Sequence, residues 1–197
     1  MKKIFKLLFI ALVSIPLYGC NDKDSLKFSK DDTKLFIVSD THYLSSTLLD
    51  SNIDYDEEGK QITKDGRTVQ YINTLIDKLF DKVISEKPDY FIITGDLTFN
   101  GEKVSHLELA NKMKILLDNG IQPLVIPGNH DMCMSKSARD YIPGSSKVVS
   151  DIKYDEFPTI YADYGYSGAI RKDLEQSHSY IYQTKNIHDH NETQIKE

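Results

Sequence analysis

The sequence predicts an α/β domain with a parallel β-α-β-α-β core. Three runs of strand length, within residues 34–40, 89–96 and 121–131, are almost entirely apolar, which is typical of strands buried on both faces of a parallel sheet. Two segments of helical periodicity lie between them, so the three strands are expected to be parallel. With 197 residues, 40% of them apolar and 27% charged, the composition is typical of one soluble globular domain.

The first 19 residues are predicted to be a secretion signal rather than part of the fold. Lys2, Lys3 and Lys6 precede an apolar run that is too short to span a bilayer comfortably. The run ends in "LYGC", which resembles the lipobox of bacterial lipoproteins, where cleavage precedes a cysteine that is then lipidated. This resemblance implies that Cys20 is a lipid anchor holding an extracytoplasmic protein at the bacterial cell membrane. The alternatives are a simple secretory signal or an uncleaved anchor, and either would also export the chain.

A polar tether is predicted over residues 20–33, because this segment lacks apolar periodicity, and the domain is expected over residues 34–197. Removing residues 1–19 takes away three of the 24 basic residues and none of the 30 acidic ones, which leaves a net charge of −9. An acidic body argues against binding a phosphate backbone, so no nucleic-acid-binding surface is expected. Cys133 is the only cysteine besides Cys20, so lipidation leaves no intramolecular disulfide.

Two helices are predicted from apolar residues spaced three and four positions apart. The first covers residues 68–87 and ends before Pro88, and the second covers residues 101–120 and ends at Gly120. His106 lies in the first turns of the second helix and is expected at the surface, although this region is near the predicted site. The apolar positions are Val69, Ile72, Ile76, Leu79, Phe80 and Val83 in the first helix, and Val104, Leu107, Met113, Leu116 and Leu117 in the second.

The pattern is weaker after residue 131. Residues 132–150 indicate a long loop, residues 151–170 a short aromatic-rich helix with a turn, and residues 179–184 a strand. The tail over residues 185–197 is polar and has no place in a core. The tyrosines of the aromatic-rich region are expected to pack this part of the chain: Tyr154, Tyr161, Tyr164 and Tyr166.

Polar residues that can bind metals follow each predicted strand. Asp40 and His42 come after the first strand, Asp96 after the second, and Gly-Asn-His-Asp, residues 128–131, after the third. Ligands of open α/β sheets bind beyond the carboxyl ends of the strands, so these residues are expected to share one site. A single ending of this kind would be an ordinary turn cap, but three on consecutive strands favour a site for zinc, manganese or iron.

These strand ends resemble a known family. The segments "SDTHY", "ITGDLTFNGE" and "IPGNHDM" are similar, in order and character, to the first three signature blocks of the calcineurin-like metallophosphoesterases. The segment "TGDLTFNGEK" is especially similar to bacterial surface-anchored members, and the match covers residues 34–131. The resemblance implies a four-layer α/β/β/α sandwich, of which this chain carries the N-terminal half. It also implies hydrolysis of a phosphomonoester or phosphodiester substrate.

The resemblance further implies a dinuclear metal site. Asp40 and His42 would bind the first divalent ion, Asp96 would bridge both ions, and Asn129 would bind the second through its side-chain oxygen. The two ions would be manganese, iron or zinc. They would lower the pKa of a bridging hydroxide that attacks phosphorus and stabilise both the attacking and the leaving oxygen.

Two catalytic residues, His130 and Asp131, are also implied by the resemblance. His130 would protonate the departing alkoxide or stabilise the charged transition state. Asp131 stands where members of the family often have an acid beside that histidine.

The later blocks of the family, a histidine after a further strand and a Gly-His-x-His segment, have no counterpart before Glu197. The chain is therefore expected to be truncated, with the C-terminal half of the domain missing. His188 and His190 are two residues apart but are expected to lie in a solvated tail, and His178 at a strand edge. The alternative function is a catalytically inactive surface lipoprotein or a truncated remnant, acting at most as a binding module.

Overall fold

The structure, a computed structural model, describes residues 32–52, 69–145, 147–167, 169–173 and 181–184. The chain divides into two compact units, Met1–Asp32 and Thr33–Glu197, and every helix and strand below belongs to the second. None of the helices in the described ranges is long and apolar enough to cross a bilayer. The predicted signal, the lipid anchor and three of the histidines lie outside the described residues: Cys20, His178, His188 and His190.

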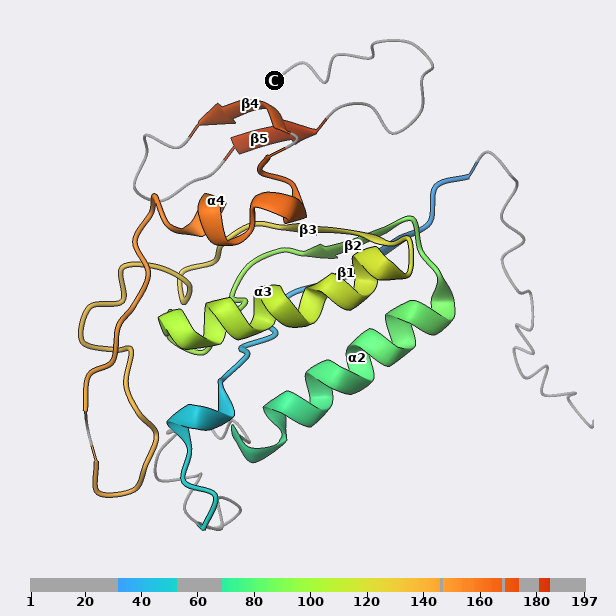
Figure 1. The fold of residues 1–197 in the computed structure, drawn as a ribbon. Helices are drawn as coiled ribbons and strands as arrows, with labels where there is room; N and C mark the ends of the chain where they lie inside the picture. The colour runs from blue at the N-terminus through green and yellow to red at the C-terminus, as the bar shows by residue number, and fades with distance from the viewer. Residues whose placement is uncertain (1–31, 53–68, 146, 168, 174–180, 185–197) are drawn as a thin grey trace, which may run out of the picture. The chain divides into compact units, whose positions relative to one another are not determined.

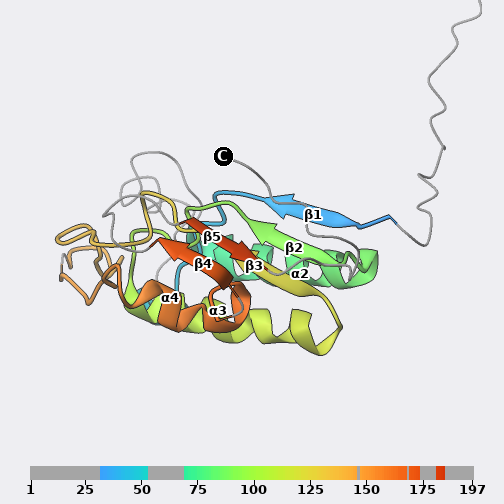
Figure 2. The same ribbon diagram turned by 90° about the horizontal axis from the view of Figure 1, so that it is seen from above.

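A three-stranded parallel sheet lies at the centre of the second unit (Figures 1 and 2), which confirms the predicted α/β core. Its strands are β1 (Leu35–Val38), β2 (Tyr90–Ile93) and β3 (Gln122–Val125), in the order β1-β2-β3. The last residues of the strands pair with one another, Val38 with Ile93 and Ile93 with Val125. The segments that follow the strands therefore begin at one level along the carboxyl edge of the sheet.

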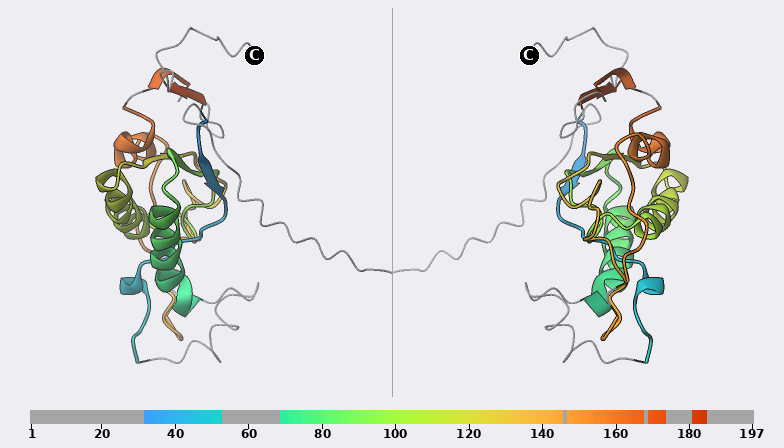
Figure 3. Two further views of the ribbon diagram at one scale, coloured as in Figure 1. Left: turned by 90° about the vertical axis from the view of Figure 1, so that its right-hand side faces the viewer. Right: turned by 90° about the vertical axis from the view of Figure 1, so that its left-hand side faces the viewer.

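Two helices connect these strands and lie on the same side of the sheet (Figures 1 and 3). A 3-10 turn, η2 (Val69–Tyr71), leads into α2 (Ile72–Glu86), and α3 (Lys103–Asp118) connects β2 to β3. Right-handed crossovers between strands that step in one direction place both helices on one face. A further 3-10 turn, η1 (Ser46–Leu48), follows β1.

The two faces of the sheet differ in burial, which corrects the prediction that the strands are buried on both sides. Phe91 and Val125 are completely buried, whereas Leu35 and Ile37 of β1 are 50% and 57% exposed. Side chains alternate between the faces of a strand, and within the described residues both helices cover the same face. A continuous apolar run thus predicted each strand correctly but could not say which face is covered.

The helices agree with the predicted spans but not with every predicted face. α2 ends at Glu86, and its C-cap Lys87 has a left-handed φ of 48°, just before Pro88. Of its predicted apolar positions, Leu79 is partly buried and the others are buried: Ile72, Ile76, Phe80 and Val83. In α3, however, Leu107 is 50% exposed while Ser105 and His106 are buried. The cause is the chain after β3, since its Phe157 packs edge-to-face against His106 at 5.8 Å and covers that side of the helix.

The rest of the described chain adds two short helical segments and a pair of strands. α4 (Phe157–Ile160) and η3 (Ala162–Tyr164) form the predicted aromatic-rich helix and turn. β4 (Ala169–Asp173) pairs antiparallel with β5 (Ile181–Thr184), which confirms the strand predicted near residues 179–184. The predicted packing role holds for three buried tyrosines, since Tyr161 and Tyr166 pack against Phe157 and Tyr164 packs against Tyr161.

Candidate metal centre

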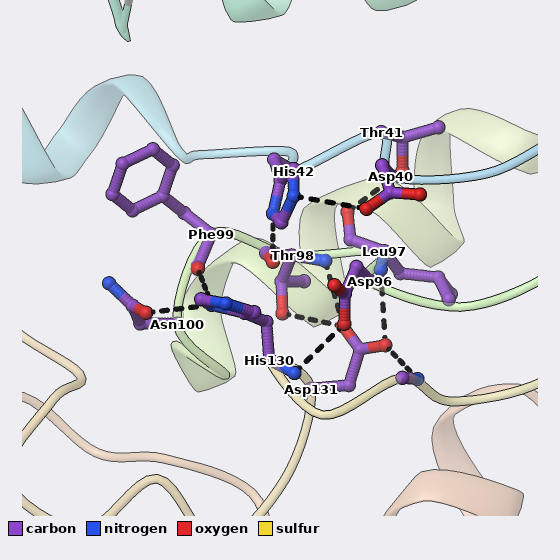
Figure 4. Close-up of polar contacts among 11 residues, drawn as sticks. Asp40, Thr41, His42, Asp96, Leu97, Thr98, Phe99, Asn100, His130 and Asp131 are labelled. Atoms are coloured by element: carbon purple, nitrogen blue, oxygen red, sulfur yellow. Dashed lines mark hydrogen bonds and ion pairs between the residues drawn. The ribbon is translucent and has the colours of Figure 1, made fainter. Parts of the chain in front are cut away.

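The segments that follow the strands converge at the carboxyl edge of the sheet (Figure 4). Backbone pairing between the segments after β1 and β2 continues past the strands themselves. The N–H of Asp40 donates to the carbonyl oxygen of Gly95 at 3.1 Å, and the N–H of His42 donates to that of Asp96 at 3.0 Å. This pairing brings the polar residues of two separate sequence blocks next to each other.

Asp40, His42 and Asp96 form a compact group of metal-binding side chains. One ligand atom from each lies within 4.8 Å of the other two. The three residues also share an unusual backbone conformation, with φ values of 55°, 42° and 50°. This left-handed region costs a residue other than glycine about 1 kcal/mol or more, and such residues cluster at functional sites because the surrounding fold must hold them there.

The ring of His42 directs one nitrogen to the main chain and the other to Asp40. Its Nδ1 lies 3.3 Å from the carbonyl oxygen of Thr98, and its Nε2 lies 3.6 Å from Oδ1 of Asp40. A carbonyl oxygen only accepts, so Nδ1 donates to Thr98, and Nε2 faces the carboxylate of Asp40, beside which an ion would be held. Metal-binding histidines commonly have this arrangement. Two carboxylates and one neutral imidazole therefore fit a divalent ion of the zinc, manganese or iron kind.

His130 lies next to this group. Its N–H donates to Oδ1 of Asp96 at 2.9 Å, and its ring meets the ring of His42 edge-to-face at 5.1 Å. Nδ1 of His130 lies 2.9 Å from the carbonyl oxygen of Phe99 and 3.0 Å from Oδ1 of Asn100. Because the carbonyl of Phe99 can only accept, Nδ1 is the protonated nitrogen, and Nε2 is the atom left to act on a substrate.

Asp131 is completely buried and joins the loops that follow β2 and β3. Its carboxylate accepts hydrogen bonds from the N–H groups of Gly128 (2.7 Å), Leu97 (3.1 Å) and Thr98 (2.8 Å), and from the hydroxyl of Thr98 (3.0 Å). Burial raises the pKa of Asp131 to about 6, although these donors act in the opposite direction. A carboxylate enclosed in this way favours a positioning role over direct contact with a substrate, and the predicted catalytic role of Asp131 stays a prediction.

Asn129 lies in the same turn, between Gly128 and His130, and is exposed. Its assignment as a ligand of a second ion stays a prediction.

Two residues of the site were assigned no role from the sequence, although they lie in the segment "ITGDLTFNGE". The carbonyl oxygen of Thr98 holds His42, and the side chain of Asn100 contacts His130. The signal in the sequence that could have identified them was their position shortly after Asp96, in the turn that faces the site.

His106 is completely buried, which corrects its predicted surface position. Its Nε2–H donates to the carbonyl oxygen of Asp131 at 2.7 Å, and its Nδ1 accepts from the hydroxyl of Tyr161 at 2.8 Å. Burial lowers the pKa of His106 to about 3, so the ring is neutral at physiological pH. Its hydrogen bond to the main chain of Asp131 helps to hold the turn that carries His130.

The buried, neutral His106 is expected to make the fold sensitive to acid. The unfolded chain binds a proton at His106 near the ordinary pKa of 6.5, but the folded chain does not until about pH 3. The free energy of unfolding therefore falls as the pH drops through this window, by up to about 1.4 kcal/mol per pH unit. Urea unfolding at about pH 7 and about pH 5.5 should show a loss about 1 kcal/mol larger for wild type than for His106→Gln. Equal losses would contradict the burial of a neutral ring.

Comparison with known families places the whole site inside one matched region. The model of the calcineurin-like phosphoesterase family matches residues 33–194, which include the five strands of the described residues and every candidate site residue described above. A comparison with curated proteins gives no match. The matched region covers well over half of the 197 residues.

Proposed function

The chain belongs to the calcineurin-like phosphoesterase family, and from that premise we propose that it hydrolyses a phosphomonoester or phosphodiester with the help of two divalent metal ions. The family implies metal-dependent hydrolysis of phosphoesters. The observation that carries the proposal for this chain is the convergence of Asp40, His42 and Asp96 at the carboxyl edge of the sheet, with their ligand atoms within 4.8 Å. The number of ions and the type of ester belong to the proposal.

In this proposal the strand-end residues hold the ions. Asp40 and His42 would bind the first ion, Asp96 would be shared between both, and Asn129 would bind the second. When bound, such ions lower the pKa of water and stabilise the oxygens that attack and leave phosphorus. Asp96 also accepts the 2.9 Å hydrogen bond from the N–H of His130, and this bond would hold His130 beside the ions.

His130 would act on the leaving group. Its Nδ1–H is held by the carbonyl oxygen of Phe99 and by Asn100, so a second proton on the ring would lie on Nε2. From Nε2 the ring could protonate the departing alkoxide or stabilise the charge that develops on it. Asp131 would contribute indirectly, because its four hydrogen bonds hold the turn in which His130 lies.

We also propose that the protein is exported and held at a bacterial membrane by a lipid on Cys20. The support is the basic and apolar N-terminal segment that ends in "LYGC". The substrate would then be a phosphoester outside the cytoplasm. Metabolic labelling with a fatty acid tests this proposal, since wild type should incorporate the label and Cys20→Ala should not. Equal labelling of the two would show that the anchor is wrongly assigned.

Hydrolysis of p-nitrophenyl phosphate and of its bis-ester by residues 21–197 tests the proposed activity. We expect turnover that requires manganese, is lost in His42→Ala and is retained in Asp81→Asn, a control at an exposed position on α2. Preference for one of the two esters would identify the substrate class. A folded protein that binds manganese but hydrolyses neither ester would contradict catalysis and would favour a binding module.

A further inference from the structure

A chain of side-chain hydrogen bonds leads from His130 away from the ligand group and into the protein. Nδ1 of His130 lies 3.0 Å from Oδ1 of Asn100, and Nδ2 of Asn100 lies 2.8 Å from the hydroxyl of Tyr141. That hydroxyl lies 2.6 Å from Oε1 of Glu102. We infer that Glu102, acting through Tyr141 and Asn100, positions His130 for its reaction, and this inference rests on the function proposed above.

The chemistry of these groups fixes the direction of every bond in the chain. The carboxylate of Glu102 only accepts, so the hydroxyl of Tyr141 donates to it. The Tyr141 oxygen then accepts from the amide N–H of Asn100, which turns the amide oxygen toward His130. One orientation of the Asn100 amide satisfies both neighbours, and in this orientation its oxygen accepts a hydrogen bond from Nδ1–H of the histidine.

Helix capping does not explain the position of Glu102. It is the N-cap residue of α3, but its side chain makes no hydrogen bond to the helix. The carboxylate instead accepts from Tyr141 and from the N–H of Asn100 at 3.1 Å, and the residue is completely buried. Burying a carboxylate is costly even when it has hydrogen-bond partners. Loss of contact with water raises the pKa of Glu102. The two donors satisfy both of its oxygens and fix its orientation at the end of the chain.

Tyr141 also affects the second acceptor of His130. Its ring packs edge-to-face on Phe99 at 4.9 Å, and the carbonyl oxygen of Phe99 lies 2.9 Å from Nδ1 of His130. The phenol therefore fixes both groups that hold this proton, one by packing and one by hydrogen bonding. Each bond in the chain orients the next, from the carboxyl group of Glu102 to the amide of Asn100, so Nδ1–H is held in place and Nε2 is directed to the substrate.

Tyr141→Phe is the sharpest probe, because it removes one oxygen and keeps the ring against Phe99. Tyr164→Phe is a matched control, since the buried hydroxyl of Tyr164 donates to the carbonyl oxygen of Ala110 and takes no part in the chain.

The measurement is the NMR resonance of the Nδ1 proton of His130 in the metal-free protein, identified by its loss in His130→Gln. This resonance should move upfield in Tyr141→Phe and not in Tyr164→Phe. Glu102→Gln should move it in the same direction. An unmoved resonance in both chain variants would overturn the inference.

Kinetics separate a positioning role from a merely structural one. With manganese, Tyr141→Phe should lower kcat for an alkyl phosphate by about tenfold, at the low end of the effects of outer-shell partners, and should leave KM unchanged. The loss should be smaller with p-nitrophenyl phosphate, because its leaving group needs less help from an acid. If His130→Ala is fully active, the proposed function of His130 fails. If His130→Ala is inactive while Tyr141→Phe behaves like Tyr164→Phe, only the inference about the chain fails.

Discussion

Replacing Asp96 by Asn is expected to weaken manganese binding at least about 100-fold, because the variant loses the carboxylate that both ions would share. This loss should exceed the effect of removing an outer-shell partner, which is about 10- to 100-fold. The change is conservative in other respects. Asn tolerates the left-handed φ of 50° at this position, and its side-chain oxygen can still accept from the N–H of His130.

Calorimetric titration with manganese measures this effect directly, and the stoichiometry of wild type tests the proposal of two ions. Asp81→Asn is the matched control, since it removes the same charge from an exposed position on α2 and should bind as wild type does. Unchanged manganese affinity in Asp96→Asn would mean that the ligand assignment is wrong.

Replacing Gly128 by Ala is expected to disrupt the same site by a steric route. A Cβ at this position would lie 2.2 Å from Oδ1 of Asp96 and 2.3 Å from its backbone nitrogen, much closer than nonbonded atoms approach. Gly128 cannot retreat without breaking the 2.7 Å hydrogen bond from its own N–H to Asp131. Overpacking of this kind costs about 1–3 kcal/mol, and a displacement of about 1 Å at a reacting centre can cost about 100-fold in rate.

Urea unfolding and hydrolysis assays together test the Gly128→Ala prediction. Gly144→Ala serves as the control, because Gly144 has a φ of 78° but no atom within 4 Å of a new Cβ. That variant should show only the cost of a left-handed alanine, about 1 kcal/mol, and full activity. Wild-type activity in Gly128→Ala would show that the loops after β2 and β3 do not pack as closely as described.

The order of the strands and helices could be predicted from the sequence because the signals are local. Apolar runs of strand length, a three- and four-residue periodicity, and the residues before Pro88 and at Gly120 all act within a few positions of one another. Parallel strands then bring their carboxyl ends to one edge without further information. For this reason the group of Asp40, His42 and Asp96 was predicted as neighbours and is found as neighbours.

The buried polar contacts could not be predicted in this way, because they join residues far apart in the chain. The carboxylate of Asp131 binds the N–H of Leu97 across 34 positions, and the hydroxyl of Tyr141 reaches Glu102 across 39. Nothing in the local pattern distinguishes an acid beside His130 that meets a substrate from one enclosed by backbone donors. His106 was misplaced for the same reason, since α4 and the loop after β3 cover a helix face that looks polar in sequence.

The sequence by itself determined the parallel core, the family resemblance and the set of metal-binding residue types at the strand ends, because these depend on periodicity and on the order of short blocks. Only the tertiary structure decided which face of the sheet the helices cover, which acid is buried and which nitrogen of His130 holds its proton. Those features depend on how closely separate loops approach one another, as at Gly128 and Asp96. A hydrogen bond or a steric contact between loops is set by distances of a few tenths of an ångström, and no local pattern of residues encodes them.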